Sequence, residues 1–390
     1  MRQQSMRKYP HRLAALLLCL ALWVGLLIPA AGAAAVSTPD PADLAADLQQ
    51  LGLLQGVSEG AADFDLDRAP TRAEALTMLI RVLGKESEAL NGTWSHPFTD
   101  VPAWAAPYVG YAYEHQLTTG VSDTRFGSTQ TVDLASYLTF LLRALGYSDQ
   151  TNAEFSWKFP HALATQAGIL PLEVDWSDFR RADLVRVSYA ALSAALKDSD
   201  TTLAQRLIAD GVFTQAQFEA VYRPDAFADS AAVHSAVAQV ILAREGGLAA
   251  ENVFRGESHV VLEAARRGGT LTVTVRYFCG RYTYRGSGSS TTGSSGIAVV
   301  TLAGSSGGPY TLTAYRSGPV DDMPLSAQAQ QRSDLLAKAP GALQAVCTAQ
   351  ADAWHRASQA LPSDEVSVES PAPPSSDASD TEEGVSTVSL

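Results

Sequence analysis

Residues 71–84, TRAEALTMLIRVLG, contain the pattern that decides the fold of the N-terminal half of this chain. Leu76, Leu79, Ile80 and Leu83 recur at the i, i+3, i+4, i+7 spacing of a helix with one buried face. Thr71 and Glu74, three residues apart at the start, match a capping box. The stretch therefore predicts a helix that opens at Thr71 and needs a partner for its apolar face.

The pattern returns further along the chain. Residues 133–146, DLASYLTFLLRALG, repeat it 62 positions later and end in the same Arg-x-Leu-Gly text. A looser copy begins at residues 180–183, RRAD. Phe64 and Phe126 precede the first two copies by seven residues, so each copy predicts a helix, a loop and a second helix. A single such pair cannot hide its apolar face, and we expect the three copies to pack together.

Composition limits the classes of protein to which this chain can belong. The chain has 390 residues, of which 46% are hydrophobic, enough for two or three domains with buried cores. Its net charge is −13, and the first 33 residues carry four bases and no acid, so the remainder carries −17. A surface this acidic argues against nucleic acid as the main partner.

The first 33 residues match a secretory signal peptide. Basic residues up to Arg12 precede an apolar run of 16 residues, Leu13 to Ile28, and Ala31-Gly32-Ala33 gives a small-x-small cleavage pattern. The run is short for a membrane span, although an uncleaved anchor is the alternative. We therefore expect a secreted chain that meets the membrane only during export.

Amino-acid composition and periodicity divide the exported chain into further segments. Residues 362–390 hold seven acids, no base and many Ser and Pro, and such a composition predicts a disordered tail. The expected segments are a signal peptide at 1–33, repeats at 40–85, 96–148 and 153–198, a helical connector at 199–228, an α+β domain at 229–361 and the acidic tail at 362–390.

The repeats resemble S-layer-homology (SLH) domains. The family pattern has a Phe-x-Asp-Val start, a Trp, a helix, a Gly-containing loop, a Phe, and Thr-Arg-Ala-Glu at the start of a second helix. The second copy has Phe98-Thr99-Asp100-Val101, Trp104, Gly120 and Phe126, and the first has Phe64 and Thr71-Arg72-Ala73-Glu74. The resemblance covers about 160 residues.

The sequence departs from this family pattern in each copy. The first copy lacks the Phe-x-Asp-Val start. The second reads Asp133-Leu134-Ala135-Ser136, without the Arg and the Glu. The third keeps Arg181 and Asp183 but has no Thr, and it lacks the Asp-Val start. In this family the ligand-binding grooves lie between the repeats, and these departures indicate that at least one of the three grooves has lost its binding function.

The resemblance implies an all-α module of three repeats that binds secondary cell-wall polysaccharide, which often carries pyruvate ketals. By resemblance, Arg72 and Arg181 would face an anionic sugar, and Glu74, Asp183, Asp100 and Trp104 would shape the site. A guanidinium donates two parallel hydrogen bonds to a carboxylate or ketal acid. The structural alternative is a capping role for Thr71 and Glu74, which leaves Arg72 unexplained, and a core position for Trp104.

The C-terminal part predicts an α+β domain with a four-stranded antiparallel sheet. A helical stretch around Val233 to Ile241 precedes strand-like runs at 258–267 and 270–284 that turn at Gly268-Gly269. A Gly/Ser loop at 286–296, strands at 297–303 and 310–315, and helices at 325–338 and 342–360 complete the domain. This order predicts helices on one face of the sheet. The domain faintly resembles small α+β domains of Gram-positive surface proteins, and that resemblance implies a fold only.

Two further features of this part have alternative interpretations. Six arginines and no acid lie between Glu263 and Asp321, among several tyrosines. They form either an anion-binding surface or, as we favour, a solvated sheet face. Cys279 and Cys347 either form a disulfide or are two separate buried thiols.

No motif in the sequence indicates catalysis. The histidines fall in no metal-binding spacing, and Glu257 with His259 is expected on a strand surface. An EF-hand spacing at Asp63, Asp65, Asp67 and Glu74 lacks its glycine, since Arg68 stands there. We expect no cofactor, no metal and no catalytic residue. The sequence favours a secreted protein held at a bacterial cell surface by its repeats, which displays a binding or sensing domain; a cell-wall-anchored hydrolase is the alternative.

Overall fold

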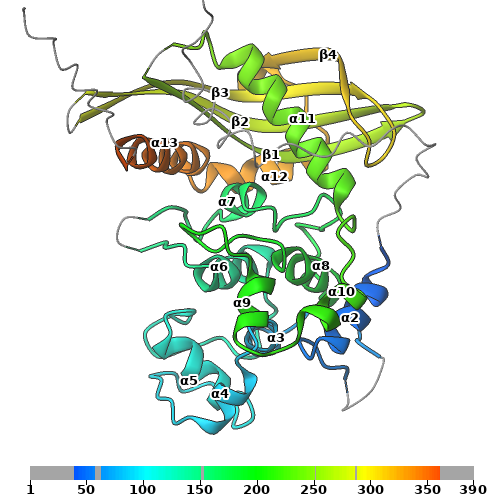
Figure 1. The fold of residues 1–390 in the computed structure, drawn as a ribbon, viewed down its shortest axis with the longest axis vertical. Coiled ribbons are helices and arrows are strands. Elements are labelled where there is room, and N and C mark those ends of the chain that lie inside the picture. Colours follow the sequence, from blue (N-terminus) through cyan, green and yellow to red (C-terminus); the bar gives the residue numbers. More distant parts are fainter. Residues whose placement is uncertain (1–38, 58–62, 151–152, 251, 286–287, 361–390) are drawn as a thin grey trace, which may run out of the picture.

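The fold is that of a computed structural model, which describes residues 39–57, 63–150, 153–250, 252–285 and 288–360. The expected signal peptide and acidic tail lie outside the described residues. A helical region is followed by an α+β part with a four-stranded antiparallel sheet, as the sequence predicts (Figure 1).

Three helix pairs form the N-terminal region. The first helices of the pairs are α2 (Pro41–Gln50), α5 (Ala106–Glu114) and α7 (His161–Gln166), and the second helices are α3 (Arg72–Val82), α6 (Leu134–Ala144) and α8 (Arg181–Ala191). Short helices accompany them: α4 (Glu86–Asn91) before the second pair, and α9 (Leu203–Ala209) and α10 (Gln215–Val221) after the third.

The predicted capping residues and helix ends of α3 and α6 are confirmed. Thr71 and Glu74 form the capping box of α3, and the Asp133 side chain accepts a hydrogen bond from the backbone of Ser136 at the start of α6. Gly84 and Gly146 follow the last turns of α3 and α6 with φ of 67° and 99°. Only glycine adopts this left-handed conformation at little cost, which explains the matching Leu-Gly text at both helix ends.

The helix pairs interlock in a closed ring. The second helices α3, α6 and α8 contact one another, and each is also covered by the first helix of a different pair: α5 on α3, α7 on α6 and α2 on α8. Backbone bonds join neighbouring pairs, because the Arg72 amide donates to Gln130 O at 2.8 Å and the Arg181 amide to Arg68 O at 3.0 Å. No pair buries its apolar face alone, so the ring is the folding unit.

The C-terminal sheet is an antiparallel meander in the order β1-β2-β3-β4. Its strands are β1 (Val253–Arg267), β2 (Thr270–Arg285), β3 (Gly288–Ala303) and β4 (Thr311–Gly318). The predicted hairpin turn at Gly268-Gly269 is confirmed. The predicted Gly/Ser loop is wrong: Gly288 to Gly296 belong to β3, because their backbone pairs with β2 from Arg285 to Tyr277. The backbone hydrogen bonds to β2, whose sequence favours a strand, outweigh the weak β-propensity of Gly and Ser.

Helices cover both faces of the sheet, so the prediction of helices on one face is wrong. On one face, Val233, Val237 and Ile241 of α11 (Ala228–Glu245) pack against Val273 and Val275 of β2. The opposite face carries α12 (Ala327–Ala337) and α13 (Ala342–Ala360), after a 3₁₀ turn at Val320–Asp322. Successive side chains on a strand point to opposite faces. On β2, Val273 and Val275 face α11, whereas Tyr282 packs on Cys347 and Ala351 of α13 on the other face.

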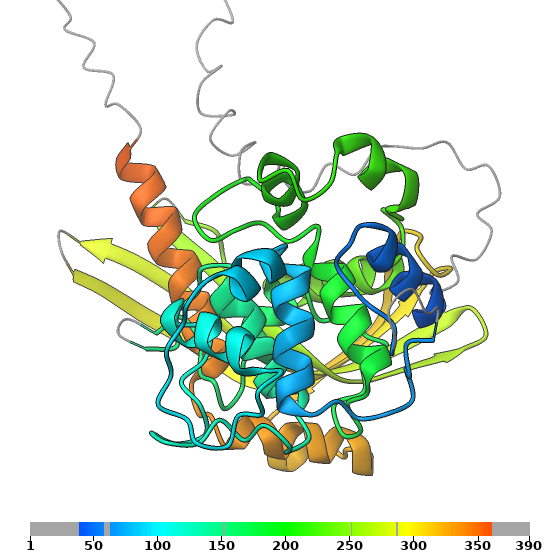
Figure 2. The same cartoon turned by 90° about the horizontal axis from the view of Figure 1, so that it is seen from below.

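The helical ring and the sheet share one core. One cluster of buried side chains continues from the helical ring into β1, α12 and α13, and α7 packs directly on β1 and α13. Figure 1 shows α12 and α13 between the sheet and the helical ring, with α7 as the helix of the ring that faces them, and in Figure 2 strands β2 and β3 extend beside α13. The two parts are therefore joined by a packed interface.

The six arginines of the C-terminal part do not form one surface. Arg276 donates to Ser333 of α12 at 2.9 Å, whereas Arg266 approaches Asp229 of α11 on the opposite face at 3.4 Å. Such partners favour the structural interpretation of these side chains over a continuous anion-binding face.

Cys279 and Cys347 are separate buried thiols. Cys279 faces α11, whereas Cys347 lies on α13 with Tyr282 and Ala351. Burial raises the pKa of Cys279 to about 11 and also raises the pKa of Cys347. Since thiolate is the reactive form, we expect neither thiol of the native mature chain to react with a disulfide reagent at neutral pH, and both to react in denaturant. A native titre of one thiol or more would contradict this arrangement.

Candidate functional site

A cavity of about 470 Å³ opens between the first and second helix pairs. Arg72 at the start of α3 lies on one side of it. The loop Thr119–Asp123 and the α6 side chains of Ser136, Thr139, Phe140 and Arg143 form most of the remaining wall, and Gln150 and Trp157 complete it. We call this cavity the Arg72 groove. Its volume is in the range of pockets that bind small molecules and sugar units.

Arg72 is the unusual group in this groove. Its guanidinium carbon lies 4.6 Å from the ring centroid of Phe140 and 5.1 Å from that of Phe126. Its Nε is buried and has no hydrogen-bond partner among the described residues. Burial lowers the pKa of Arg72 to about 10, and Asp133 opposes that shift only in part. The groove thus holds a desolvated cation on an aromatic floor without a carboxylate bonded to it.

Arg143, the second arginine of the groove, is already paired. Its Nε and Nη2 donate to the two carboxylate oxygens of Asp149 at 2.9 and 2.7 Å, and its Nη1 donates to Leu117 O at 3.2 Å. Two parallel bonds of this kind satisfy the guanidinium and neutralise its charge. Of the two arginines in the groove, only Arg72 therefore has no ion pair among the described residues, and the exposed Asp123 is the acidic residue of the lining.

Trp157 and Val121 form an open rim. Their side chains belong to residues that are 58% and 49% exposed, and both line the Arg72 groove. An exposed indole beside a cation is a common arrangement for binding sugars, because the ring face packs on apolar C–H groups. The groove thus combines an exposed indole and an arginine without an ion pair in the described ranges.

Asp100 does not line the groove but binds the backbone of the neighbouring loop. Its two carboxylate oxygens accept hydrogen bonds from the backbone amides of Phe126 and Gly127 at 2.7 and 2.8 Å. Burial raises the pKa of Asp100, but these backbone bonds outweigh it and lower the pKa overall. Asp100 holds in place the loop that carries Phe126, and Phe126 lies under Arg72.

Glu74 and Asp183 are engaged in helix starts. Glu74 completes the capping box with Thr71 and receives two bonds from Arg68, both of 3.0 Å. Asp183 is 4% exposed and accepts from the Arg180 amide at 3.1 Å and from Arg186 Nη1 at 3.0 Å. The capping interpretation of Glu74 is confirmed, whereas ligand contact by either carboxylate stays a prediction.

Arg181 differs from Arg72 in its surroundings. Arg181 is 7% exposed, and its Nε donates to the backbone oxygen of Phe64 at 2.7 Å. The corresponding Nε of Arg72 makes no such bond. The structure thus gives Arg181 a partner within the protein, and its contact with a ligand stays a prediction.

The expectation that Trp104 lies in the core is wrong. The residue is 53% exposed and does not line the Arg72 groove. It precedes α5, whose buried face is already filled by Tyr108, Val109 and Ala112. Sequence analysis also missed Phe140, Arg143 and Trp157; the repeated Arg-x-Leu-Gly text was the available signal for Arg143.

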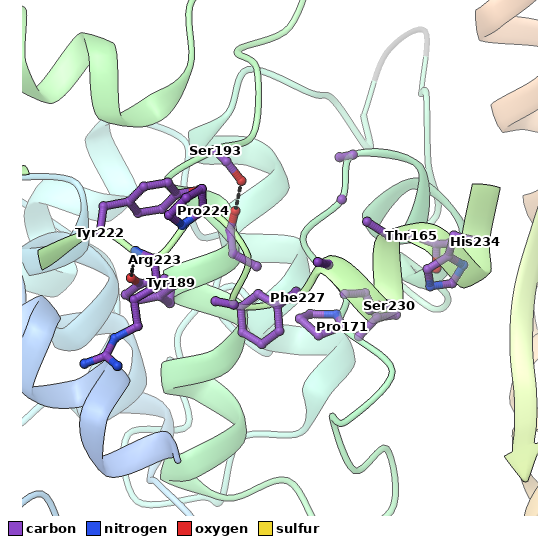
Figure 3. A pocket seen from close by; sticks show the side chains of 17 residues that line it. Thr165, Pro171, Tyr189, Ser193, Tyr222, Arg223, Pro224, Phe227, Ser230 and His234 are labelled. Atoms are coloured by element: carbon purple, nitrogen blue, oxygen red, sulfur yellow. Dashed lines mark hydrogen bonds between the residues drawn. The ribbon is translucent and has the colours of Figure 1, made fainter. Parts of the chain in front are cut away.

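A second cavity, of about 350 Å³, lies between α8, residues 222–228 and the start of α11 (Figure 3). Tyr189, Tyr222 and Phe227 give it an aromatic wall. Its arginine is paired, because Arg223 Nε donates to Asp47 at 2.7 Å and the Arg223 amide donates to Tyr189 Oη at 2.8 Å. This cavity offers a ligand mostly apolar surface, so it suits a charged sugar less well than the Arg72 groove does.

Within the described ranges, no cluster of three or more His, Cys, Asp or Glu side chains is placed to hold a metal ion. In the same part of the chain, no helix combines the length and the apolar character that crossing a bilayer requires.

The fold and the groove together define the chain as a ring of helix pairs with an arginine-containing groove, packed against an α+β part. No protein-family model matches the chain. The chain is 33% identical over 125 residues to the middle cell wall protein of Brevibacillus brevis, a match covering 32% of this chain and 11% of that protein. It is 35% identical over 102 residues to the surface layer protein of Brevibacillus choshinensis, covering 26% and 9% of the two chains.

A cell surface protein of Thermoanaerobacter kivui is also 35% identical, over 111 residues that make up 28% of this chain and 14% of that protein. The chain thus matches about a tenth of the length of each of these relatives. All three relatives are named as cell-wall, surface-layer or cell-surface proteins, and this supports a cell-surface or cell-wall-associated protein.

Proposed function

We propose that the helical ring is an SLH-type anchor, and that it holds this secreted chain on the bacterial cell wall by binding an anionic secondary cell-wall polysaccharide in the Arg72 groove. The chain then displays its α+β part as a non-catalytic binding or sensing surface. One observation carries the proposal: Arg72 is a partly buried cation with a buried Nε and no ion pair within the described part of the chain, at the wall of an open groove.

Electrostatics supports an acidic ligand. A buried charge costs free energy unless an opposite charge or hydrogen bonds compensate for it. An acid group on a sugar, such as a carboxylate or a ketal acid, would provide both for Arg72. Because Arg143 already binds Asp149, one acidic group at a time would satisfy the groove.

The resemblance and the relatives support the same proposal. The Arg72 text lies in the motif that resembles SLH domains, and the relatives are named cell-wall, surface-layer and cell-surface proteins. Of the two motif arginines, Arg72 lines an open cavity, whereas Arg181 is buried and donates to the Phe64 carbonyl. If each chain has a single groove of low affinity, firm attachment would require several chains held together, or a cell wall with a high density of polysaccharide.

Co-sedimentation with purified cell walls tests the proposal. The full mature chain should pellet with intact walls and remain in solution after chemical removal of the secondary polysaccharide. Equal pelleting with stripped walls would refute polysaccharide anchoring. Release of soluble sugar or peptide fragments in the same assay would instead indicate the anchored hydrolase.

Trp157→Ala tests the stacking surface at the rim. We expect about tenfold weaker wall binding, because stacking of one aromatic ring is typically worth about 1 kcal/mol or more. The unfolding midpoint should not change, since the side chain is mostly exposed. The matched control is Trp104→Ala, also exposed but outside the groove, which should bind like the wild type. An equal loss of wall binding in both variants would show that Trp157 does not contact the polysaccharide.

A further inference from the structure

Two buried histidine sites lie at the interface between the helical ring and the α+β part. At the first site, His234 of α11 and His259 of β1 approach each other, with His234 Nδ1 2.9 Å from His259 Nε2. His259 Nδ1 lies 3.0 Å from Glu257 Oε2. The expectation that Glu257 and His259 lie on a strand surface is wrong, because their side chains are 12% and 5% exposed.

The first site involves elements from both parts of the chain. It borders a cavity of about 140 Å³ that is lined by α7, α11, β1 and α13. The α7 residues there are Ala162, Thr165 and Gln166, and α13 contributes Gln350, so neither helix brings a titratable side chain. The ionisable side chains that line this cavity are therefore His234, His259 and Glu257.

The hydrogen-bond chain accepts one added proton but not two. A carboxylate only accepts, so His259 Nδ1 carries a proton and donates to Glu257. In the neutral pair, His234 Nδ1 donates to His259 Nε2. One added proton reverses that bond and leaves an imidazolium beside Glu257. A second proton leaves no acceptor between the rings and places two cations in contact.

The second site is His161, at the first residue of α7. Its ring is 3% exposed and lies 4.5 Å from the centroid of Phe159 and 4.3 Å from that of Trp176. Its Nδ1 has no hydrogen-bond partner among the described residues. The charged groups that act on it are Asp133 at the start of α6 and Arg332 of α12, whose guanidinium lies 4.7 Å over Trp176.

We infer that this interface is an acid-sensitive joint: protonation of His161 and of the His234–His259 pair opens the contact of α7 with β1 and α13. The closed interface has no acceptor for a second proton on the His234–His259 pair and no hydrogen-bond partner for His161 Nδ1 among the described residues, whereas an opened one exposes both sites to water. The helix ring itself keeps its own core contacts, so opening frees the α+β part from α7 without dismantling α3 and α6.

The direction of the pH dependence follows from burial. Burial lowers the pKa of His161 and of His234 to about 3, and His259 adds to the shift of His234. In an opened interface each would return to about 6.5. Above pH 6.5 both states are unprotonated and the interface is unaffected. Below it, each histidine favours opening by up to about tenfold per pH unit, until the pH reaches the lowered pKa.

Hydrogen–deuterium exchange of the full mature chain tests this inference. Exchange is compared at about pH 7.5 and pH 5, with each rate divided by the intrinsic rate at that pH, a range in which ordinary histidines titrate and most carboxylates do not. We expect the amides of α7 and β1 to exchange at least about tenfold faster at the lower pH. The amides of α3 should keep their protection.

Two substitutions separate the histidines from other acid effects. His161→Phe keeps a ring between Phe159 and Trp176, and His234→Asn keeps an amide N–H donor near the Nδ1 position. The double variant should keep α7 and β1 protected at about pH 5, and His115→Gln, at an exposed histidine, should open like the wild type. If the double variant does not fold, His161→Phe alone should lose about half of the pH effect on a logarithmic scale.

Three results would overturn the inference. The first is equal protection of α7 and β1 in the wild type at both pH values. The second is loss of protection in α3 to the same extent as in α7, which would indicate general acid unfolding. The third is an unchanged response in the histidine variants, which would assign the effect to carboxylates.

Discussion

Arg72→Met is expected to abolish most of the binding to polysaccharide-bearing cell walls, with a loss of at least about tenfold and up to about a thousandfold. The substituted side chain keeps a stem of similar length over Phe126 and Phe140 but lacks the charge and the donors. Because Arg143 is bound to Asp149, no other uncompensated cation in the groove can replace it.

The same substitution should leave the fold intact. Removing an unpaired buried cation recovers its desolvation cost, and this offsets the lost contacts with the two rings. The free energy of unfolding should therefore stay within about 1 kcal/mol of the wild-type value. Loss of binding without loss of stability distinguishes a ligand contact from a structural role.

Arg125→Met is the matched control. Arg125 is an exposed arginine whose Nε lies 3.9 Å from Asp100, on the loop next to the groove. It should bind walls like the wild type, because an exposed and loosely paired charge contributes little. Full pelleting of Arg72→Met, or equal loss in Arg125→Met, would contradict the assignment of Arg72.

Phe126→Ala is expected to reduce the free energy of unfolding by about 3–5 kcal/mol. The ring is fully buried, and its centroid lies 5.8 Å from that of Phe98 and 5.1 Å from the Arg72 guanidinium carbon. Its loss leaves a cavity between the helix pairs and removes half of the aromatic floor of the groove. Chemical denaturation followed by circular dichroism measures the change.

Val121→Ala is the comparison for Phe126→Ala. Val121 lies on the same loop and lines the same groove, but it is 49% exposed. We expect a change within about 0.5 kcal/mol. A cost below about 1 kcal/mol for Phe126→Ala would mean that the interior around the loop collapses to fill the space.

Local interactions account for the features that could be predicted from the sequence. The capping box at Thr71 and Glu74, the helix end at Gly84 and the hairpin turn at Gly268-Gly269 each depend on residues within about four positions of one another. The strand at Gly288 to Gly296 could not be predicted in this way, because β2 imposes it through backbone pairing.

In the candidate site, too, local sequence predicts some features and contacts between distant segments decide the others. Motif resemblance drew attention to Arg72 and Arg181 alike, and nothing in the sequence distinguishes their environments. In the fold, Arg181 reaches the Phe64 carbonyl, whereas Arg72 lies over two rings with its Nε unpaired. Trp157 is more than 80 positions from Arg72 in the chain and reaches the groove only because the ring of helix pairs closes.

The sequence by itself determined the three helix pairs, the starts and ends of α3 and α6, and the four-stranded antiparallel sheet apart from the first half of β3, since the periodicity, capping and turn chemistry behind them are local. Only the tertiary structure decided which arginine keeps an unpaired charge, that helices cover both faces of the sheet, and that buried histidines meet where α7 packs on β1. These properties depend on contacts between segments far apart in the chain, and burial sets the electrostatic cost of each charge there.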